Sequence, residues 1–145
     1  MTAVLDLGLY NDHARTSGWL VRLHNDIRDV STAVRLPGKP GDVLAIGRAA
    51  SSGSRRTPDG TVAVTPLLLK DDRTPPQVSG DHAEICMADD GSWTLRHNSR
   101  NAGTFINEGP AIRASDKGPE PPRVLQHGDK IRFGGGKPKR RSCVA

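Results

Sequence analysis

Ser79 and His82 lie three residues apart in the segment VSGDHAEI (78–85), where an alternating apolar run begins. A hydroxyl and an imidazole at this spacing have two possible roles, nucleophilic chemistry or the shaping of a loop. A catalytic serine of this kind needs a strained turn such as G-x-S-x-G, a base and an oxyanion hole. VSGDHAEI lacks the G-x-S-x-G setting, which argues against a catalytic triad.

Other enzyme sites are not indicated either. The segment IRFGGGKPKRR (131–141) has glycines and lysines but not the order of a phosphate-binding P-loop. Cys86 and Cys143 form no CxxC pair, and we expect Cys86 to be a small core residue. The histidines show no metal-ligand spacing; they are His13, His24, His82, His97 and His127. We therefore predict no metal, no cofactor and no enzymatic activity.

The elements that must position Ser79 and His82 are short strands. Apolar residues occur in bursts of strand length, several of them with two-residue alternation. The expected strands are 19–24, 31–36, 43–47, 61–69, 82–87, 92–97, 104–107 and 130–134. The 16 glycines and 11 prolines punctuate these bursts, and ADDG (88–91) predicts a hairpin turn. No segment keeps a helical period over three turns, so we predict an all-β sandwich with decorated loops.

One domain is expected from 145 residues of which 34% are hydrophobic. Residues 1–18 contain no periodic pattern, so we expect an N-terminal extension there and the domain over 19–145. The composition of SSGSRRTPDG (51–60) predicts an inserted loop near 49–60. No apolar run approaches the roughly 20 residues that span a bilayer, and the start lacks a secretory signal. We expect an intracellular, soluble protein of the nucleus or cytoplasm, with no membrane partner.

The formal net charge of +5 suggests an anionic partner, with phosphate as the leading candidate. Aromatic residues make up 3% of the chain, which argues against a nucleic-acid partner because single-strand binders normally offer stacking platforms. Much of the positive charge lies at 137–141, KPKRR, which matches a short nuclear import pattern. Alternatively, RRSCVA (140–145) forms the last strand of the sandwich.

Four fragments occur in order along the chain: IGR (46–48), SGDH (79–82), NAGTFIN (101–107) and LQHGDKIRFG (125–134). Together they resemble the forkhead-associated (FHA) domain, whose pattern is G-R, S-x-x-H, N-G-T-x-x-N and then G-D-x-I-x-x-G. The resemblance covers residues 19 to 135. It implies a β-sandwich of about eleven strands that binds phosphothreonine peptides through loops at one end.

The resemblance implies a role for each matching residue. Arg48 is expected to meet phosphate oxygens with its planar guanidinium, and Ser79 to donate its hydroxyl to the same phosphate. Backbone N–H groups of the Ser79–Gly80 turn are expected to form a small anion-binding concavity. His82 is expected to hydrogen-bond within the loop and hold Ser79. The residues expected to support the loops are Gly47, where the chain turns, His82, Gly103, Thr104 and Asn107.

The sequence departs from the family pattern at two positions. Ala102 occupies the place of the asparagine that contacts the peptide backbone, and Asn101 stands one residue earlier. Either a shifted loop lets Asn101 serve, or one hydrogen bond of about 0.5–1.5 kcal/mol is missing. Gly80 occupies a place where the family often has Arg, Lys or Asn. Arg100, or Arg55 and Arg56 of the inserted loop, are candidates to restore that charge.

The first functional hypothesis is a monomeric, non-enzymatic adaptor that recognises phosphothreonine in signalling, DNA-damage or cell-cycle partners. The second keeps the fold as a scaffold for phosphate-independent protein interaction, which Gly80 and Ala102 motivate. A third, nucleic-acid binding led by the basic tail, predicts steeply salt-dependent binding. Three threonines precede prolines, a context that proline-directed kinases accept, although prolines also follow turn residues; they are Thr57, Thr65 and Thr74.

Overall fold

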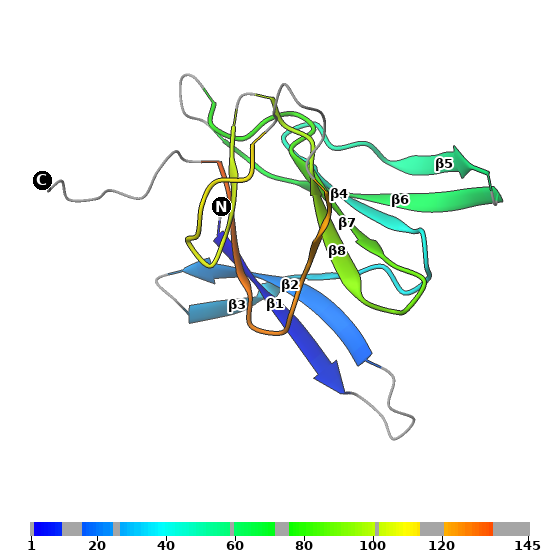
Figure 1. Ribbon diagram of the computed structural model, residues 1–145. Coiled ribbons are helices and arrows are strands. Elements are labelled where there is room, and N and C mark those ends of the chain that lie inside the picture. Colours follow the sequence, from blue (N-terminus) through cyan, green and yellow to red (C-terminus); the bar gives the residue numbers. More distant parts are fainter. Residues whose placement is uncertain are drawn as a thin grey trace, which may run out of the picture.

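The computed structural model describes residues 2–9, 16–24, 27–58, 60–71, 76–100, 102–113 and 121–134. Within these ranges the chain forms eleven strands in two sheets and no helix (Figure 1). In the same ranges, therefore, no helix has the length and apolar character needed to cross a membrane. The strands and sheets confirm the predicted all-β sandwich of about eleven strands.

The first sheet has five strands in the order β3 (Ile27–Arg35), β2 (Thr16–His24), β1 (Thr2–Leu9), β11 (Lys130–Phe133) and β9 (Thr104–Ile106). The second has six strands in the order β10 (Arg123–Val124), β8 (Trp93–His97), β7 (Ala83–Met87), β4 (Val43–Gly47), β6 (Gly60–Leu68) and β5 (Gly53–Thr57). Neighbouring strands are antiparallel except β4 and β6, which are parallel. Each of the predicted strands overlaps an observed one, and ADDG is the β7–β8 turn, closed by the Gly91 N–H on the Ala88 carbonyl.

The first strand differs from the expected extension over residues 1–18. β1 lies between β2 and β11, and Ala3 and Val4 are buried. Its sequence, TAVLDLGL, includes aspartate and glycine, which are depleted in strands. The pairing with β11 joins residues far apart in the sequence, so no local pattern indicated it. The predicted last strand, RRSCVA, and the basic segment 137–141 lie outside the described residues.

The predicted inserted loop also differs from the structure, because part of it forms β5. β5 and β6 pair in an antiparallel hairpin whose tip has a hydrogen bond of 3.2 Å from Thr57 Oγ1 to the Gly60 carbonyl. This hairpin extends away from the body of the sandwich (Figure 1). β5 reads GSRRT and has no apolar alternation, so its strand conformation comes from pairing with β6 rather than from its own side chains.

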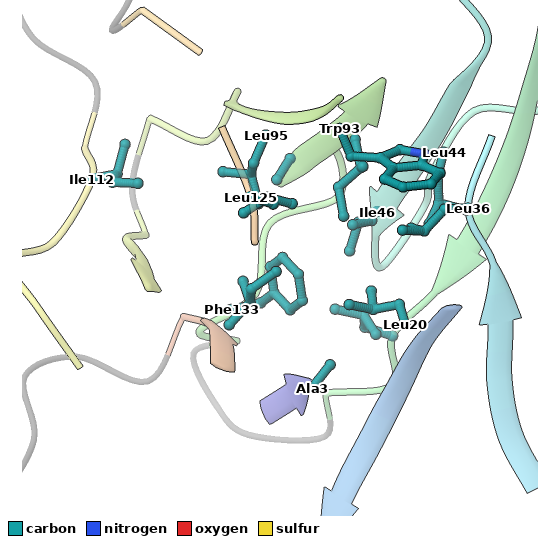
Figure 2. Packing of buried hydrophobic residues seen from close by; sticks show 14 of the residues in the cluster. Ala3, Leu20, Leu36, Leu44, Ile46, Trp93, Leu95, Ile112, Leu125 and Phe133 are labelled. Atoms are coloured by element: carbon teal, nitrogen blue, oxygen red, sulfur yellow. The ribbon is translucent and has the colours of Figure 1, made fainter. Parts of the chain in front are cut away.

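The main core lies between the two sheets (Figure 2). Its largest fully enclosed members include Leu20, Leu44, Ile46, Leu95 and Phe133. β4 is buried on both of its faces, because Leu44 and Ile46 belong to this core while Val43 and Ala45 form a second, smaller cluster. Cys86, a free cysteine, packs half-buried against that second cluster, as expected of a small core residue. The residues that follow β4 are thus attached to one of the most enclosed strands of the fold.

Candidate functional site

The end of β4 and the start of β7 bring two of the four sequence fragments together. The two strands pair antiparallel with Ile46 opposite Ala83, so the chain leaving β4 runs beside the chain entering β7. Beyond the strands, the Arg48 N–H donates to the Ser79 carbonyl at 3.0 Å and the Ala49 N–H to the Gly80 carbonyl at 2.9 Å. Arg48 and Ser79, 31 positions apart in the sequence, therefore share one backbone ladder.

Gly47 is required by this close approach rather than by the turn expected from the sequence. A Cβ atom at residue 47 would lie 2.1 Å from the Gly80 carbonyl oxygen. No side chain fits that space, since real Cβ contacts do not come so near. Gly47 thus lets the backbone after β4 lie directly against the Ser79–Gly80 turn.

The Arg48 side chain is exposed but held at one point. Its Nε–H donates to the Val78 carbonyl, at the base of the Ser79 turn. Within the described part of the chain, its two terminal nitrogens have no hydrogen-bond partner. The guanidinium is therefore fixed in orientation while its outer edge remains free for an anion, which suits two parallel bonds to a phosphate.

The turn that carries Ser79 is also held by hydrogen bonds to Asp71. One carboxylate oxygen of Asp71 accepts the Gln77 N–H at 2.6 Å and the Val78 N–H at 2.8 Å. Gly134 lies against the same turn, because a Cβ there would be 1.9 Å from the Gln77 carbonyl oxygen. Asp71 was not predictable from the sequence, since no spacing marks a carboxylate seven residues before Val78.

His82 fixes the turn from the core side and is completely buried, with 0% exposure. Its Nδ1 accepts the Ser79 N–H at 3.1 Å, so Nε2 carries the hydrogen and donates to the Gly103 carbonyl at 3.0 Å. The ring also meets the rings of His97 and Phe133 edge to face. His82 therefore joins the Ser79 turn to the β8–β9 loop.

The burial of His82 lowers its pKa from 6.5 to about 4, an effect to which His97 adds and which the bond to Gly103 opposes. The imidazole is therefore neutral at physiological pH. Only the neutral ring can accept the Ser79 N–H, because both nitrogens of imidazolium are donors. Of the two N–H groups expected to form an anion-binding concavity, that of Ser79 donates to His82 and is not available to a ligand. The Gly80 N–H has no partner in the described ranges.

Ser99, in the β8–β9 loop, is a site residue that the sequence analysis missed. Its hydroxyl is hydrogen-bonded to the Ser79 hydroxyl and accepts the Ala102 N–H at 3.0 Å. Its own N–H donates to the His82 carbonyl at 3.0 Å, and the residue is 2% exposed. Ser99 stands two residues before the fragment NAGTFIN, and nothing in the spacing distinguishes it from a loop residue.

The remaining predicted support residues shape the β8–β9 and β9–β11 connections. Gly103 accepts from His82 and from the Gly134 N–H at 2.8 Å, and a Cβ at this position would press on Ala111 at 3.3 Å. Thr104 is buried and its hydroxyl bonds His97 Nδ1 at 2.8 Å. Asn107 has a left-handed backbone, with φ of 55°, and its amide bonds Asp129 and the Lys130 N–H, each at 3.0 Å.

The structure brings some of the candidate ligand-binding residues together and not others. Arg48, Ser79 and Gly80 converge, and Arg100 is an exposed neighbour of Ser99 that has no partner among the described residues. Asn101 lies outside the described residues. Arg55 is engaged elsewhere, because its guanidinium bonds both carboxylate oxygens of Glu84 at 3.1 and 3.0 Å.

The Glu84–Arg55 pair ties the β5–β6 hairpin to β7. Glu84 is 4% exposed; burial raises the pKa of its carboxyl, but the hydrogen bonds and charge of Arg55, together with Asn98 and Arg96, lower it, and the net pKa is below the ordinary value. The Arg55 side chain is 44% exposed, so the pair lies between a surface and a buried ion pair. Arg55 is therefore a hairpin anchor and not a replacement for the charge missing at Gly80.

Replacing Arg55 with alanine is expected to lower the free energy of unfolding by about 1–2 kcal/mol, because the buried Glu84 carboxylate loses its counter-ion. The measurement is urea unfolding at neutral pH. The matched control is Arg56→Ala, an exposed arginine on the same strand with no partner in the described ranges, which should change stability by less than about 0.5 kcal/mol. Equal losses for the two variants would contradict the anchoring role.

Comparison with known proteins identifies the family. The FHA domain model matches residues 44–134, more than half of the chain, and the matched range contains Arg48, Ser79, His82 and the β8–β9 loop. No curated protein and no solved structure matches the chain. FHA domains are protein-interaction modules, not a family of enzymes, and they bind phosphorylated protein partners. The chain that carries this two-sheet sandwich and this loop cluster therefore belongs to the FHA domain family.

Proposed function

We propose that this protein recognises phosphothreonine in partner proteins and acts as a monomeric signalling adaptor of the nucleus or cytoplasm. The observation that carries the proposal is the state of the Arg48 guanidinium. It is fixed through Nε on the Val78 carbonyl, and its terminal nitrogens have no partner in the described part of the chain. A planar donor fork of this kind matches the oxygens of a phosphate dianion.

The Ser79 hydroxyl and the Gly80 N–H supply further donors beside Arg48. Both belong to a turn whose backbone is already held by Asp71 and His82, so binding requires little further ordering of the chain. Arg100, exposed next to Ser99, is proposed to add positive charge at the rim. The charge of Arg100 then partly replaces that of the basic residue which the family often has at the position of Gly80.

The contact to the peptide backbone is proposed for Asn101. Ala102, which occupies the family's usual asparagine position, cannot make that contact with its side chain, and its N–H is already donated to Ser99. Asn101 directly precedes this fixed amide. Selectivity for phosphothreonine over phosphoserine would rest on one methyl group, worth about 0.8 kcal/mol, or roughly a fourfold difference in affinity.

The test is calorimetric titration with an oriented phosphothreonine peptide library, alongside the unphosphorylated and phosphoserine libraries. We expect binding by the phosphothreonine pool, weaker binding by the phosphoserine pool, and none without phosphate. Phosphatase treatment of the peptides should abolish the heat signal. Equal binding with and without phosphate would overturn the proposal in favour of a phosphate-independent scaffold.

A further inference from the structure

We propose that Ser99 is a positioning residue that directs the hydroxyl hydrogen of Ser79 toward the bound phosphate. This inference rests on the proposed function, because it specifies how the anion site of Arg48 and Ser79 is prepared. Two serines 20 positions apart share a hydroxyl–hydroxyl hydrogen bond, and the direction of that bond decides what Ser79 can offer a ligand.

The direction follows from the neighbours of Ser99. An amide N–H can only donate, so the 3.0 Å contact with the Ala102 N–H makes the Ser99 oxygen an acceptor. The hydroxyl of Ser99 has one hydrogen left to place. Since the residue is 2% exposed, that hydrogen needs a protein acceptor, and the Ser79 oxygen is the one that the described residues provide.

The opposite direction is disfavoured. If Ser79 donated to Ser99, the Ser99 hydrogen would remain buried without an acceptor in the described part of the chain, which is costly for a polar group. The hydrogen bonds therefore run from the Ala102 N–H to the Ser99 hydroxyl, and from the Ser99 hydroxyl to Ser79. Each donor in such a chain strengthens the next.

The hydroxyl hydrogen of Ser79 is then left free at the end of this series of hydrogen bonds. Ser79 is partly exposed, unlike Ser99, and its carbonyl accepts the Arg48 N–H, so its hydroxyl lies in the cluster that presents the guanidinium. A phosphate dianion, which only accepts hydrogen bonds, fits a hydroxyl whose hydrogen points outward. Ser99 thus selects an acceptor ligand without touching it.

A double-mutant cycle tests this role, with the phosphothreonine peptide pool as the probe and calorimetry as the readout. Ser99→Ala is expected to weaken binding roughly threefold to tenfold, the range of one hydrogen bond. In the Ser79→Ala background the same change should have almost no further effect, because Ser99 acts through Ser79. The matched control is Ser92→Ala in the β7–β8 turn, where the hydroxyl bonds Asp90; it should bind like the unmodified chain.

Ser99→Cys repeats the cycle with a side chain of similar size that donates weakly, so the result does not depend on how Ser99→Ala folds. Equal weakening by Ser99 substitutions with and without the Ser79 hydroxyl would overturn the inference and leave Ser99 as loop support only, while the proposed function stands. Absence of phosphate-dependent binding by the unmodified chain would overturn both.

Discussion

The Arg48→Ala variant is expected to lose phosphate-dependent binding, with at least a 100-fold weaker affinity for the phosphothreonine peptide pool. The substitution removes a bidentate, charge-assisted contact worth about 3 kcal/mol. It also removes the Nε bond to the Val78 carbonyl, which fixes the guanidinium against the Ser79 turn. Arg48→Lys should retain little binding, because an ammonium has neither the fork nor a donor at the Nε position.

The measurement is titration calorimetry of the three proteins, with thermal unfolding to show that the variants are folded. Arg56→Ala serves as the matched control, because it removes an exposed arginine on the β5–β6 hairpin and has the same effect on net charge. If the loss of binding reflected net charge alone, Arg56→Ala would weaken binding as much as Arg48→Ala. Binding by Arg48→Ala at the level of the unmodified chain would refute the assignment of the phosphate site.

The sequence predicted the sandwich because the strands that face the core carry their own signal. Short apolar bursts such as VLAIG and SWTLRH indicated β4 and β8, since burial on a pleated surface demands that composition. β5 carries no such signal, because its GSRRT side chains are mostly exposed and pairing with β6 defines it. β1 likewise depends on pairing, with the neighbouring β2 and with β11, which is distant in the sequence.

The candidate site was predictable only where a motif marks it. The order of G-R, S-x-x-H and the β8–β9 fragment indicated Arg48, Ser79 and His82. Asp71, Ser99 and the Glu84–Arg55 pair were not predictable, because each is a contact of a common residue type at a spacing that the fold alone decides. The need for glycine at position 47 was not predictable either, because the close approach of two backbone segments leaves no local signature in the sequence.

Acidification is expected to destabilise the fold through His82. Burial lowers the pKa of His82 from 6.5 to about 4, so between these pH values the unfolded chain binds a proton that the folded chain rejects. Stability therefore rises with pH across this window; it is lost as the pH falls from 6.5 to about 4, and the group adds no pH dependence above 6.5. This difference between the pKa values of the unfolded and folded chains corresponds to about 3 kcal/mol in the free energy of unfolding.

The measurement is urea unfolding at a series of pH values between 4 and 7.5 for the unmodified chain and for His82→Asn. We expect the variant to be less stable at pH 7, because it loses the bridge from Ser79 to Gly103, yet to show a flatter dependence between pH 6.5 and 4. Other titrating groups act on both proteins, so the difference between the two curves isolates His82. An unchanged slope in His82→Asn would show that this imidazole is not the acid-sensitive group. In the folded chain the imidazole gains its proton only near pH 4; an imidazolium cannot accept the Ser79 N–H, so the Ser79 turn should lose this bond only at the acidic end of the range.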